Sequence, residues 1–300
     1  ASIGAPPDDF SLNGQNWGLP PWNPNELQES AYAPYIATLR ANMRHSGALR
    51  IDHVMGLMRL FWVPEEGGPA DGTYVHYPFD DLLGILALES NRNNCLVVGE
   101  DLGTVPQEVR TKLSALGVLS YRLLYFEKDE QGDFRSPAAY PEQALVAVST
   151  HDLPTLSGYW HGEDLSERAA LGHFPSEADR DKQVIGRATD RARLLLALDR
   201  EKLLPPGLTV HSVSSPELTT ELMCAIHEFL GHAPSKILLV QIEDVLGQRR
   251  QVNMPGTSDE RSNWRHKIGI DLEDLMPDPR WRKLISVLRK FRAPVRDPGR

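Results

Sequence analysis

Five short apolar runs, each followed directly by polar or charged residues, constrain the fold of this chain more than any other feature. Such runs are typical of buried strands, and the segments between them have the spacing of amphipathic helices. The five predicted strands cover residues 48–51, 96–98, 121–126, 145–148 and 237–240. Short apolar strands that alternate with helices indicate parallel βα units, whose sheet is covered on both faces. The sequence therefore predicts an α/β fold.

The segments between these strands predict helices and one long loop. Helices are expected over residues 32–45, about 81–90, about 105–115 and most of 164–232, with a last helix that carries Trp281. Asp80 is expected to cap the second of these helices, and Thr104 with Gln107 to form a capping box at the third. Residues 1–30 contain too many prolines for a helix or a central strand, and a shaped loop is expected there.

The charge balance and the cysteines exclude several classes of protein. Lysine and arginine total 32 against 41 aspartate and glutamate residues, which gives a net charge of −9. A nucleic-acid-binding surface needs basic residues to neutralise phosphates, so no nucleic-acid partner is expected. No apolar run is long enough to span a membrane. Cys95 and Cys224 lie in apolar surroundings without metal-ligand spacing, and we interpret them as buried free thiols of a cytoplasmic protein.

Three of the predicted strands end beside a carboxylate, namely Asp52, Glu100 and Asp152. In a βα barrel the active site is built at the carboxyl ends of the strands, where these side chains would converge. Glycoside chemistry needs such a set, because one carboxylate attacks the anomeric carbon while a protonated one, with a raised pKa, donates to the leaving oxygen. A third carboxylate would stabilise the positive charge that develops on the sugar ring.

Each of the three carboxylates also has a purely structural interpretation. Asp52 would form an ion pair with Arg50, Asp101 or Glu100 would complement the positive end of the next helix, and Asp152 would cap a helix. Taken singly, each signal is weak. Their occurrence at three strand ends favours a catalytic role.

Motifs around these carboxylates make the prediction specific. Arg-Ile-Asp-His at 50–53, Val-Gly-Glu-Asp-Leu-Gly at 98–103 and Ser-Thr-His-Asp at 149–152 resemble the catalytic signatures of the 4-α-glucanotransferases, the amylomaltase or disproportionating enzymes of the α-amylase clan. Gly-Ala-Pro-Pro-Asp-Asp-Phe at 4–10 and Gly-Gln-Asn-Trp-Gly at 14–18 resemble that family's loop over the acceptor sites. Gln-Val-Asn-Met-Pro-Gly-Thr at 251–257 resembles the loop after its last barrel strand, and the likeness runs from residue 1 to about 292.

The resemblance implies a role for each matching residue. Asp52 would be the nucleophile, Glu100 the acid/base catalyst and Asp152 the transition-state stabiliser of a retaining transglycosylase, which moves α-1,4-glucan segments between maltooligosaccharides. The substrate-binding residues would be Arg50, which orients the nucleophile, His53 and His151 at hydroxyls of the transferred sugar, Gln15 and Trp17 at the acceptor sugar, and Asp8 and Asn253. The resemblance implies no cofactor and no metal.

The resemblance also implies a (β/α)8 barrel of the TIM type, with the nucleophile on its fourth strand. This chain would then hold strands four to eight and helical insertions. Residues 1–163 would form the barrel part with the acceptor loop, 164–232 a mostly helical insertion, and 233–300 the final strand and C-terminal helices. The first three strands are expected in an N-terminal segment of the same protein. The other expected partner is a maltooligosaccharide or a glucan derived from starch or glycogen.

Other functions stay open on the sequence alone. An α-glucan hydrolase of the same clan would resolve the intermediate with water, and an inactive fragment without the N-terminal barrel strands would only bind glucan. A metal-dependent barrel hydrolase is disfavoured, because His53 and His151 lack helical ligand spacing and Arg50 would oppose a cation at the nucleophile. Trp62 and Trp264 are interpreted as structural.

Overall fold

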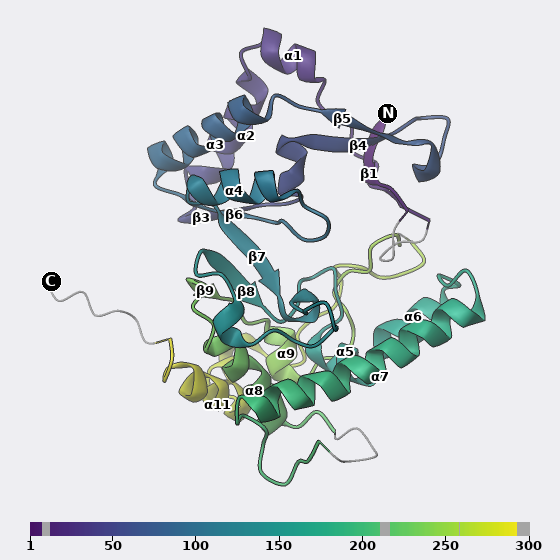
Figure 1. Cartoon of the computed structure of the whole chain (residues 1–300), viewed down its shortest axis with the longest axis vertical. Coiled ribbons are helices and arrows are strands. Elements are labelled where there is room, and N and C mark those ends of the chain that lie inside the picture. The colour runs from purple at the N-terminus through teal and green to yellow at the C-terminus, as the bar shows by residue number, and fades with distance from the viewer. Residues whose placement is uncertain (8–12, 211–216, 258, 293–300) are drawn as a thin grey trace, which may run out of the picture. The chain divides into compact units, whose positions relative to one another are not determined.

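The computed structural model describes residues 1–7, 13–210, 217–257 and 259–292, which are drawn in colour in Figure 1. The chain divides into two compact units, residues 1–121 and residues 122–300. Parallel strands and helices occur in both units, so the predicted α/β class is confirmed.

The first unit contains parallel strands that begin close to the predicted positions. They are β3 (Ala48–Ile51), β6 (Leu96–Gly99) and β7 (Leu119–Leu123), in which the boundary between the units falls. β3 pairs with β6 in parallel from Ala48↔Leu96 to Ile51↔Gly99, and β6 pairs with β7 in parallel. The carboxyl ends of β3 and β6 are therefore neighbours, which places residues 50–53 beside residues 99–101.

Four helices complete this part of the first unit. They are α1 (Pro24–Glu29), α2 (Ala33–Met43), α3 (Phe79–Asn93) and α4 (Gln107–Ala115). Their apolar faces form one core with the strands, in which Leu39, Leu86, Val97 and Val109 are all at most 4% exposed. Burying one such side chain contributes roughly 1.5–3 kcal/mol. This core holds the ends of β3 and β6 in place.

A four-stranded antiparallel sheet in the first unit was not predicted. Its order is β2-β1-β4-β5, with β1 (Ser2–Ala5), β2 (Gln15–Asn16), β4 (Arg59–Val63) and β5 (Thr73–His76). The expectation of a loop over residues 1–30 is therefore wrong for β1, β2 and α1, while residues 17–23 lie outside any helix or strand, as expected. The prolines lie outside β1 and β2, so they leave the ladder hydrogen bonds intact. Gly4 is required in β1, because a Cβ there would lie 2.0 Å from the Gln15 carbonyl oxygen of β2.

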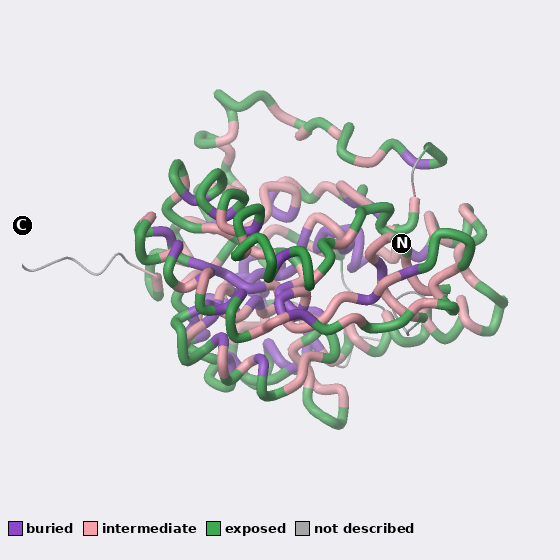
Figure 2. Tube along the Cα trace, turned by 90° about the horizontal axis from the view of Figure 1, so that it is seen from above, coloured by how far each residue is buried: buried purple, intermediate pink, exposed green. Residues whose placement is uncertain are grey.

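The second unit contains two parallel strands and seven helices among its described residues. The strands are β8 (Ala144–Ala147) and β9 (Ile237–Leu238). The helices are α5 (Leu156–His161), α6 (Glu163–Ala170), α7 (Glu177–Arg200), α8 (Thr220–Gly231), α9 (Ile242–Leu246), α10 (Leu272–Leu275) and α11 (Pro279–Leu288). Helix α8 packs against α9 and α11. Nine of the residues in α8 are buried, and buried segments of the chain are purple in Figure 2.

Several predicted boundaries differ from the observed ones. Helix α3 begins after Pro78, so Asp80 lies in its first turn instead of capping it. Helix α4 begins only at Gln107, because Pro106 disfavours helical geometry at the residue before it, and no capping box with Thr104 forms. The third strand starts and ends earlier than predicted, and residues 124–126 form a 3-10 turn. β9 is shorter than the predicted strand over 237–240.

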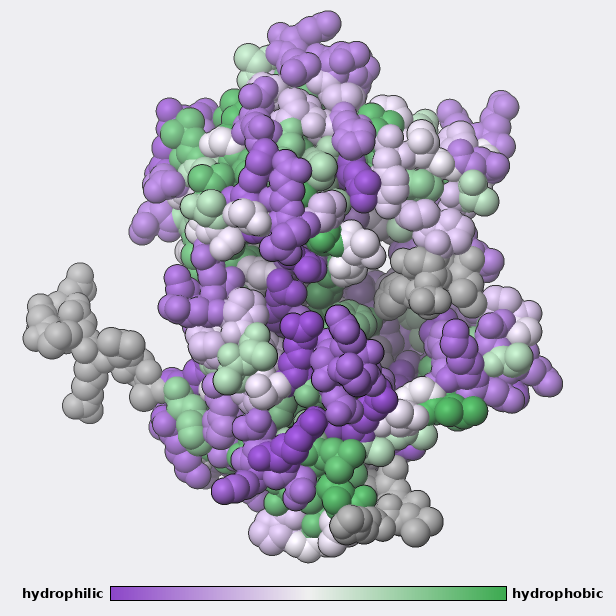
Figure 3. Space-filling view, viewed as in Figure 1, coloured by the Kyte–Doolittle hydropathy of each residue, from purple (hydrophilic) through white to green (hydrophobic). Residues whose placement is uncertain are grey.

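The surface has the character that the composition predicts. On the face shown in Figure 3, hydrophilic side chains predominate over hydrophobic ones, in a chain of which 24% of residues are charged. Each helix in the described part of the chain is too short or too polar to cross a membrane. Cys95 and Cys224 are free and buried, as predicted.

Candidate active site

The carboxylate of Asp52 is exposed and is held by a neighbouring arginine at the end of β3. An Arg50 guanidinium nitrogen, Nη2, lies 2.6 Å from Asp52 Oδ1, and the Asp52 side chain is 73% exposed. The guanidinium carbon of Arg50 lies 5.4 Å from the centroid of the Tyr121 ring. An exposed ion pair contributes at most about 1 kcal/mol to stability. Arg50 therefore contacts a carboxylate that remains accessible.

Glu100, at the end of β6, is held by backbone donors from two segments. The His53 N–H donates to Glu100 Oε2 at 2.9 Å, and the Leu102 N–H donates to Oε1 at 2.7 Å. His53 has a φ of 44°, in the left-handed region that a residue other than glycine rarely adopts. Such strained conformations occur often at functional sites. Here the strained conformation accompanies the hydrogen bond from the His53 N–H to the carboxylate.

The surroundings of Glu100 shift the pKa of its carboxyl upward. Burial raises the pKa of the Glu100 carboxyl, and the negative charge of Asp52 raises it further, while the two backbone hydrogen bonds oppose this. Burial lowers the pKa of His53, against the opposing effect of Asp52. A carboxyl with a raised pKa beside an exposed carboxylate is the arrangement that separates an acid from a nucleophile.

Asp101, the next residue, has a structural role through partners that the sequence did not reveal. It is 3% exposed, and it accepts hydrogen bonds from Ser120 Oγ at 2.6 Å and from the Tyr121 N–H at 2.9 Å. Arg110 Nε of α4 lies 3.3 Å from its carboxylate. Asp101 therefore joins the end of β6 to β7 and α4, whereas Glu100 faces His53.

Gln15 and Trp17 lie beside His53 in the first unit. The Trp17 ring meets the His53 ring edge-on at a centroid distance of 5.2 Å and is 37% exposed. Trp17 Nε1 donates to Gln15 Oε1 at 3.0 Å. An exposed indole and an amide would offer an apolar face and polar groups to one sugar ring. The predicted site residue Asp8 lies outside the described residues.

In the second unit, Asp152 is held by residues of the loop after α9. Asn253 Nδ2 donates to Asp152 Oδ1 at 2.6 Å, and the Asn253 N–H donates to the His151 carbonyl at 3.1 Å. His151 Nε2 lies 3.2 Å from Asp152 Oδ2, and both side chains are about two fifths exposed. The predicted residues His151, Asp152 and Asn253 are thus brought together.

A buried network that the sequence did not predict supports this loop. Gln251 Nε2 donates to the Asp152 carbonyl at 2.8 Å, and Arg261 donates to the Gln251 carbonyl at 2.5 Å. Arg261 also makes a two-point ion pair with Glu167 of α6 and a 2.6 Å hydrogen bond to Asn263 Oδ1. These partners are up to about a hundred positions apart in the chain, so no local pattern indicates them. Among these residues, Gln251 and Asp152 lay within motifs already noted, whereas Arg261, Glu167 and Asn263 did not.

The two tryptophans that were interpreted as structural differ from each other. Trp62 packs against the hydrophobic core of the first unit, as expected. Trp264 is 62% exposed, and its ring lies 5.0 Å from the His151 ring. The Trp264 side chain is therefore not buried by the described part of the chain.

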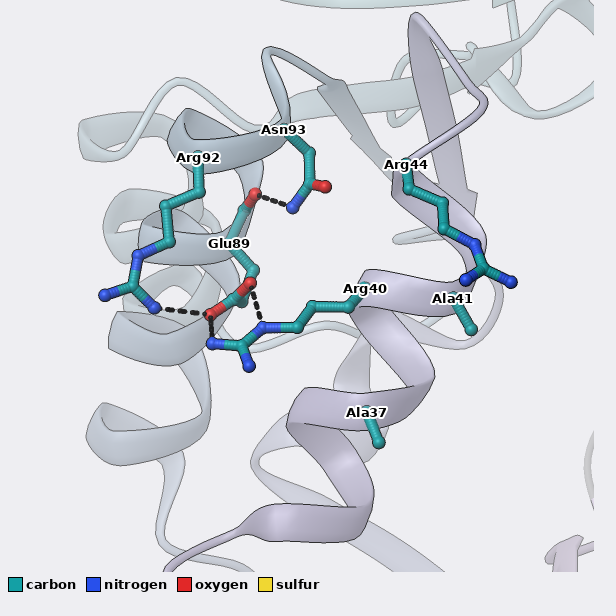
Figure 4. A pocket seen from close by; sticks show the side chains of 7 residues that line it. All are labelled: Ala37, Arg40, Ala41, Arg44, Glu89, Arg92 and Asn93. Carbon is teal, nitrogen blue, oxygen red and sulfur yellow. Dashed lines mark hydrogen bonds and ion pairs between the residues drawn. The ribbon is translucent and has the colours of Figure 1, made fainter.

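A hollow of about 620 Å³ beside α2 and α3 has a structural explanation. Figure 4 shows Arg40 reaching from α2 to Glu89 on α3, and Arg92 meeting the same carboxylate. Glu89 is 1% exposed, and the two arginines hold its pKa below the ordinary value against the effect of burial. The arginines therefore neutralise a buried carboxylate between two packed helices.

Potential metal ligands do not cluster in the described ranges. Across residues 1–7, 13–210, 217–257 and 259–292, no three His, Cys, Asp or Glu side chains are grouped so that they could hold a metal ion.

Comparison with known proteins identifies close relatives. A family model described as 4-alpha-glucanotransferase matches residues 1–271. A 4-alpha-glucanotransferase of Haemophilus influenzae is 46% identical over 272 residues, covering 91% of this chain and 38% of the relative. One of Mycobacterium tuberculosis is 41% identical over 303 residues, covering 96% and 40%. The chain thus spans about two fifths of the length of these relatives.

Solved structures agree with these matches. The amylomaltase of Corynebacterium glutamicum superposes with a TM-score of 0.86 at 33% identity, covering 96% of this chain and 42% of the other. An amylomaltase of Streptococcus agalactiae in complex with acarbose has a TM-score of 0.71 at 20% identity, covering 97% and 50%. The second likeness bears on the fold alone.

Proposed function

We propose, because this chain belongs to the 4-alpha-glucanotransferase family, that the protein is a retaining transglycosylase of α-1,4-glucans. Its substrates would be maltooligosaccharides or glucans derived from starch or glycogen. The reaction would pass through a covalent glycosyl ester on Asp52, and a second sugar would then take the place of the leaving sugar.

The two carboxylates of the first unit would carry the bond changes. Asp52 attacks the anomeric carbon, and the bond from that carbon to the leaving oxygen breaks. Glu100 gives its proton to this oxygen, so that the leaving sugar departs as an alcohol. In the second half, Glu100 takes a proton from the acceptor hydroxyl, whose oxygen displaces Asp52. Arg50 orients the attacking carboxylate.

Residues of the second unit would act on the transition state. The Asp152 carboxylate would stabilise positive charge as it develops on the sugar ring. His151 would hydrogen-bond hydroxyls of the transferred sugar together with His53, and Asn253 would hold Asp152 in the required direction. The hydrogen bond from Asn253 Nδ2 to Asp152 Oδ1 supports this last role.

Gln15 and Trp17, with Asp8, would bind the acceptor sugar. Their apolar and polar groups would favour a sugar over water in the second half of the reaction. The contact of the Trp17 ring with the His53 ring supports a place for Trp17 beside the transferred sugar.

The observation that carries the proposal is the contrast between Glu100 and Asp52 in one unit. The first is partly buried with a raised pKa, and the second is exposed and paired with Arg50. A general acid and a nucleophile need these two environments.

We further propose that the parallel strands are strands four to eight of a TIM-type barrel in a cytoplasmic protein, with the remaining strands in another segment of the same protein. Residues 1–163 and 233–300 would supply the barrel part of this chain, and residues 164–232 a helical insertion. The share of the relatives that this chain spans supports the existence of further segments.

The deciding experiment is incubation of the full-length protein with maltotriose and separation of the products by size. A ladder of longer and shorter glucans is expected from transfer. Glucose and maltose alone would identify an α-glucan hydrolase instead, and no product would indicate a protein that only binds glucan.

A further inference from the structure

Trp264 combines large exposure with a position beside the proposed sugar site. Its side chain is 62% exposed, and its ring lies 5.0 Å from the His151 ring, tilted by 45°. His151 and the neighbouring Asp152 are themselves 40% and 38% exposed. An apolar indole face, an imidazole and a carboxylate therefore stand together on an accessible surface of the second unit.

The backbone of Trp264 is strained. Its φ is 60°, in the left-handed region where a bulky side chain is a clear outlier and glycine is favoured. A residue keeps such a conformation only where its surroundings impose it, and such residues are frequent at ligand-binding sites. Packing of the indole does not provide the reason here, since the ring is mostly exposed.

Neighbouring hydrogen bonds impose this conformation. The Trp264 N–H donates to the Val252 carbonyl at 3.0 Å, within the loop that carries Asn253. Asn263 is held on one side by Arg261 and on the other by Thr257, whose hydroxyl accepts from Asn263 Nδ2 at 2.7 Å. The ion pair between the buried Arg261 and Glu167 anchors the segment to α6. The loop is therefore rigid at the point where it presents the indole.

We infer that Trp264 is a sugar-binding residue, whose indole face receives a glucose ring beside His151. The inference rests on the proposed function and adds a binding residue to that site. Aromatic rings are suited to the C–H face of a sugar, while hydroxyls at the ring edge are left for His151 and Asp152. The strained backbone is the cost of holding the indole toward the sugar.

The test compares Trp264→Gly and Trp264→Phe in the full-length protein. Binding of maltotetraose is measured by calorimetry in a Glu100→Gln background, so that the sugar is not consumed. We expect the dissociation constant to rise roughly tenfold in Trp264→Gly and less in Trp264→Phe. The melting temperature of Trp264→Gly should stay unchanged or rise, because glycine relieves the strain at this φ.

Lys202 provides a matched control. It is exposed and has a φ of 59° in the turn after α7, so Lys202→Gly relieves the same strain without removing an indole. We expect Lys202→Gly to change the melting temperature as Trp264→Gly does, and to leave maltotetraose binding unchanged.

Two results would overturn the inference. A clear fall in the melting temperature of Trp264→Gly, against Lys202→Gly, would show that Trp264 packs against another part of the full-length protein. Unchanged maltotetraose binding in Trp264→Gly would exclude a sugar contact. If the parent protein binds no maltotetraose and makes no ladder from maltotriose, the proposed function itself fails, and this inference fails with it.

Discussion

Glu100 and Asp101 are adjacent carboxylates with opposite surroundings. Asp101 faces Ser120, the Tyr121 N–H and Arg110, so it is a fixed part of the structure. Glu100 accepts hydrogen bonds from the His53 and Leu102 backbone N–H groups, and burial raises the pKa of its carboxyl. The contacts of each carboxylate, and not the residue type, distinguish the two positions.

The first prediction concerns Glu100 as the acid. Glu100→Gln should lower the rate on maltotriose by about 10²–10⁴-fold, because the leaving sugar then departs without a proton. The first step on glucosyl fluoride should be spared, since fluoride needs little protonation to leave. The two rates are measured by product chromatography and by fluoride release. An equal loss of rate on maltotriose and on glucosyl fluoride would mean that Glu100 has a structural role and is not the acid.

Asp101→Asn is the matched control for that variant. It removes a buried charge beside Arg110, so we expect a lower melting temperature and parallel losses on both donors. Glu100→Gln should show the difference between donors with little change in melting temperature.

The second prediction concerns Asp52 as the nucleophile. Asp52→Asn should lower transfer by roughly 10³-fold or more, because an amide cannot form the glycosyl ester. A fluorinated glucosyl donor should label the wild-type peptide that contains Asp52, as read by mass spectrometry. A label on Glu100 or Asp152 would reverse the assignment of roles.

At the scale of the elements, the sequence predicted the parallel strands better than the helix ends. β3, β6 and β8 lie within one residue of their predicted bounds, because continuous apolar runs bounded by polar residues leave little choice. Helix starts were less accurate, since Pro78 and Pro106 determined them more than the capping residues did. The antiparallel sheet was missed, because β2 is two residues long and depends on pairing with β1.

In the candidate site, too, the sequence predicted some residues and missed others. The carboxylates could be found because each follows an apolar strand. Arg261 and Trp264 could not, because their importance comes from partners far away in the chain, such as Glu167 and His151. Local patterns carry no information on such contacts.

The third prediction concerns Asp244, whose carboxylate connects α9 to the start of α5. It is 1% exposed, and its Oδ1 accepts from the Leu156 N–H at 2.6 Å. Burial raises the pKa of Asp244 to about 7. Between about pH 4 and pH 7 the Asp244 carboxyl is therefore protonated in the folded state and ionised in the unfolded state. The contribution of Asp244 to the free energy of unfolding consequently falls as the pH rises through this range.

Asp244→Asn keeps the acceptor for Leu156 and removes the charge. The melting temperature of the variant should exceed that of the wild type by a margin that grows up to about pH 7 and is constant above it. Calorimetry from pH 5 to 8 measures this margin. A constant difference over the whole range would mean that the pKa of Asp244 is not raised by burial.

At the scale of the whole molecule, the outer strands β3 and β9 bear on whether residues 1–300 are stable alone. Within the first unit, β3 pairs with β6 alone among the described residues, and within the second, β9 pairs with β8 alone. Two of the four residues of β3 are exposed, although parallel strands are normally buried on both faces. Such a strand offers unpaired backbone groups to another segment.

The last prediction follows from these strands and from the share of the relatives that the chain spans. Residues 1–300 expressed alone should aggregate or melt without a sharp transition, and should form no ladder from maltotriose, because in the described part of the chain β3 and β9 each have a paired strand on one side only. Supplying the N-terminal segment, in the same chain or as a separate one, should restore both the sharp transition and glucan transfer. Light scattering, calorimetry and product separation measure the three properties. A monodisperse 300-residue species with one sharp transition and a product ladder would mean that these strands close the fold without a further segment.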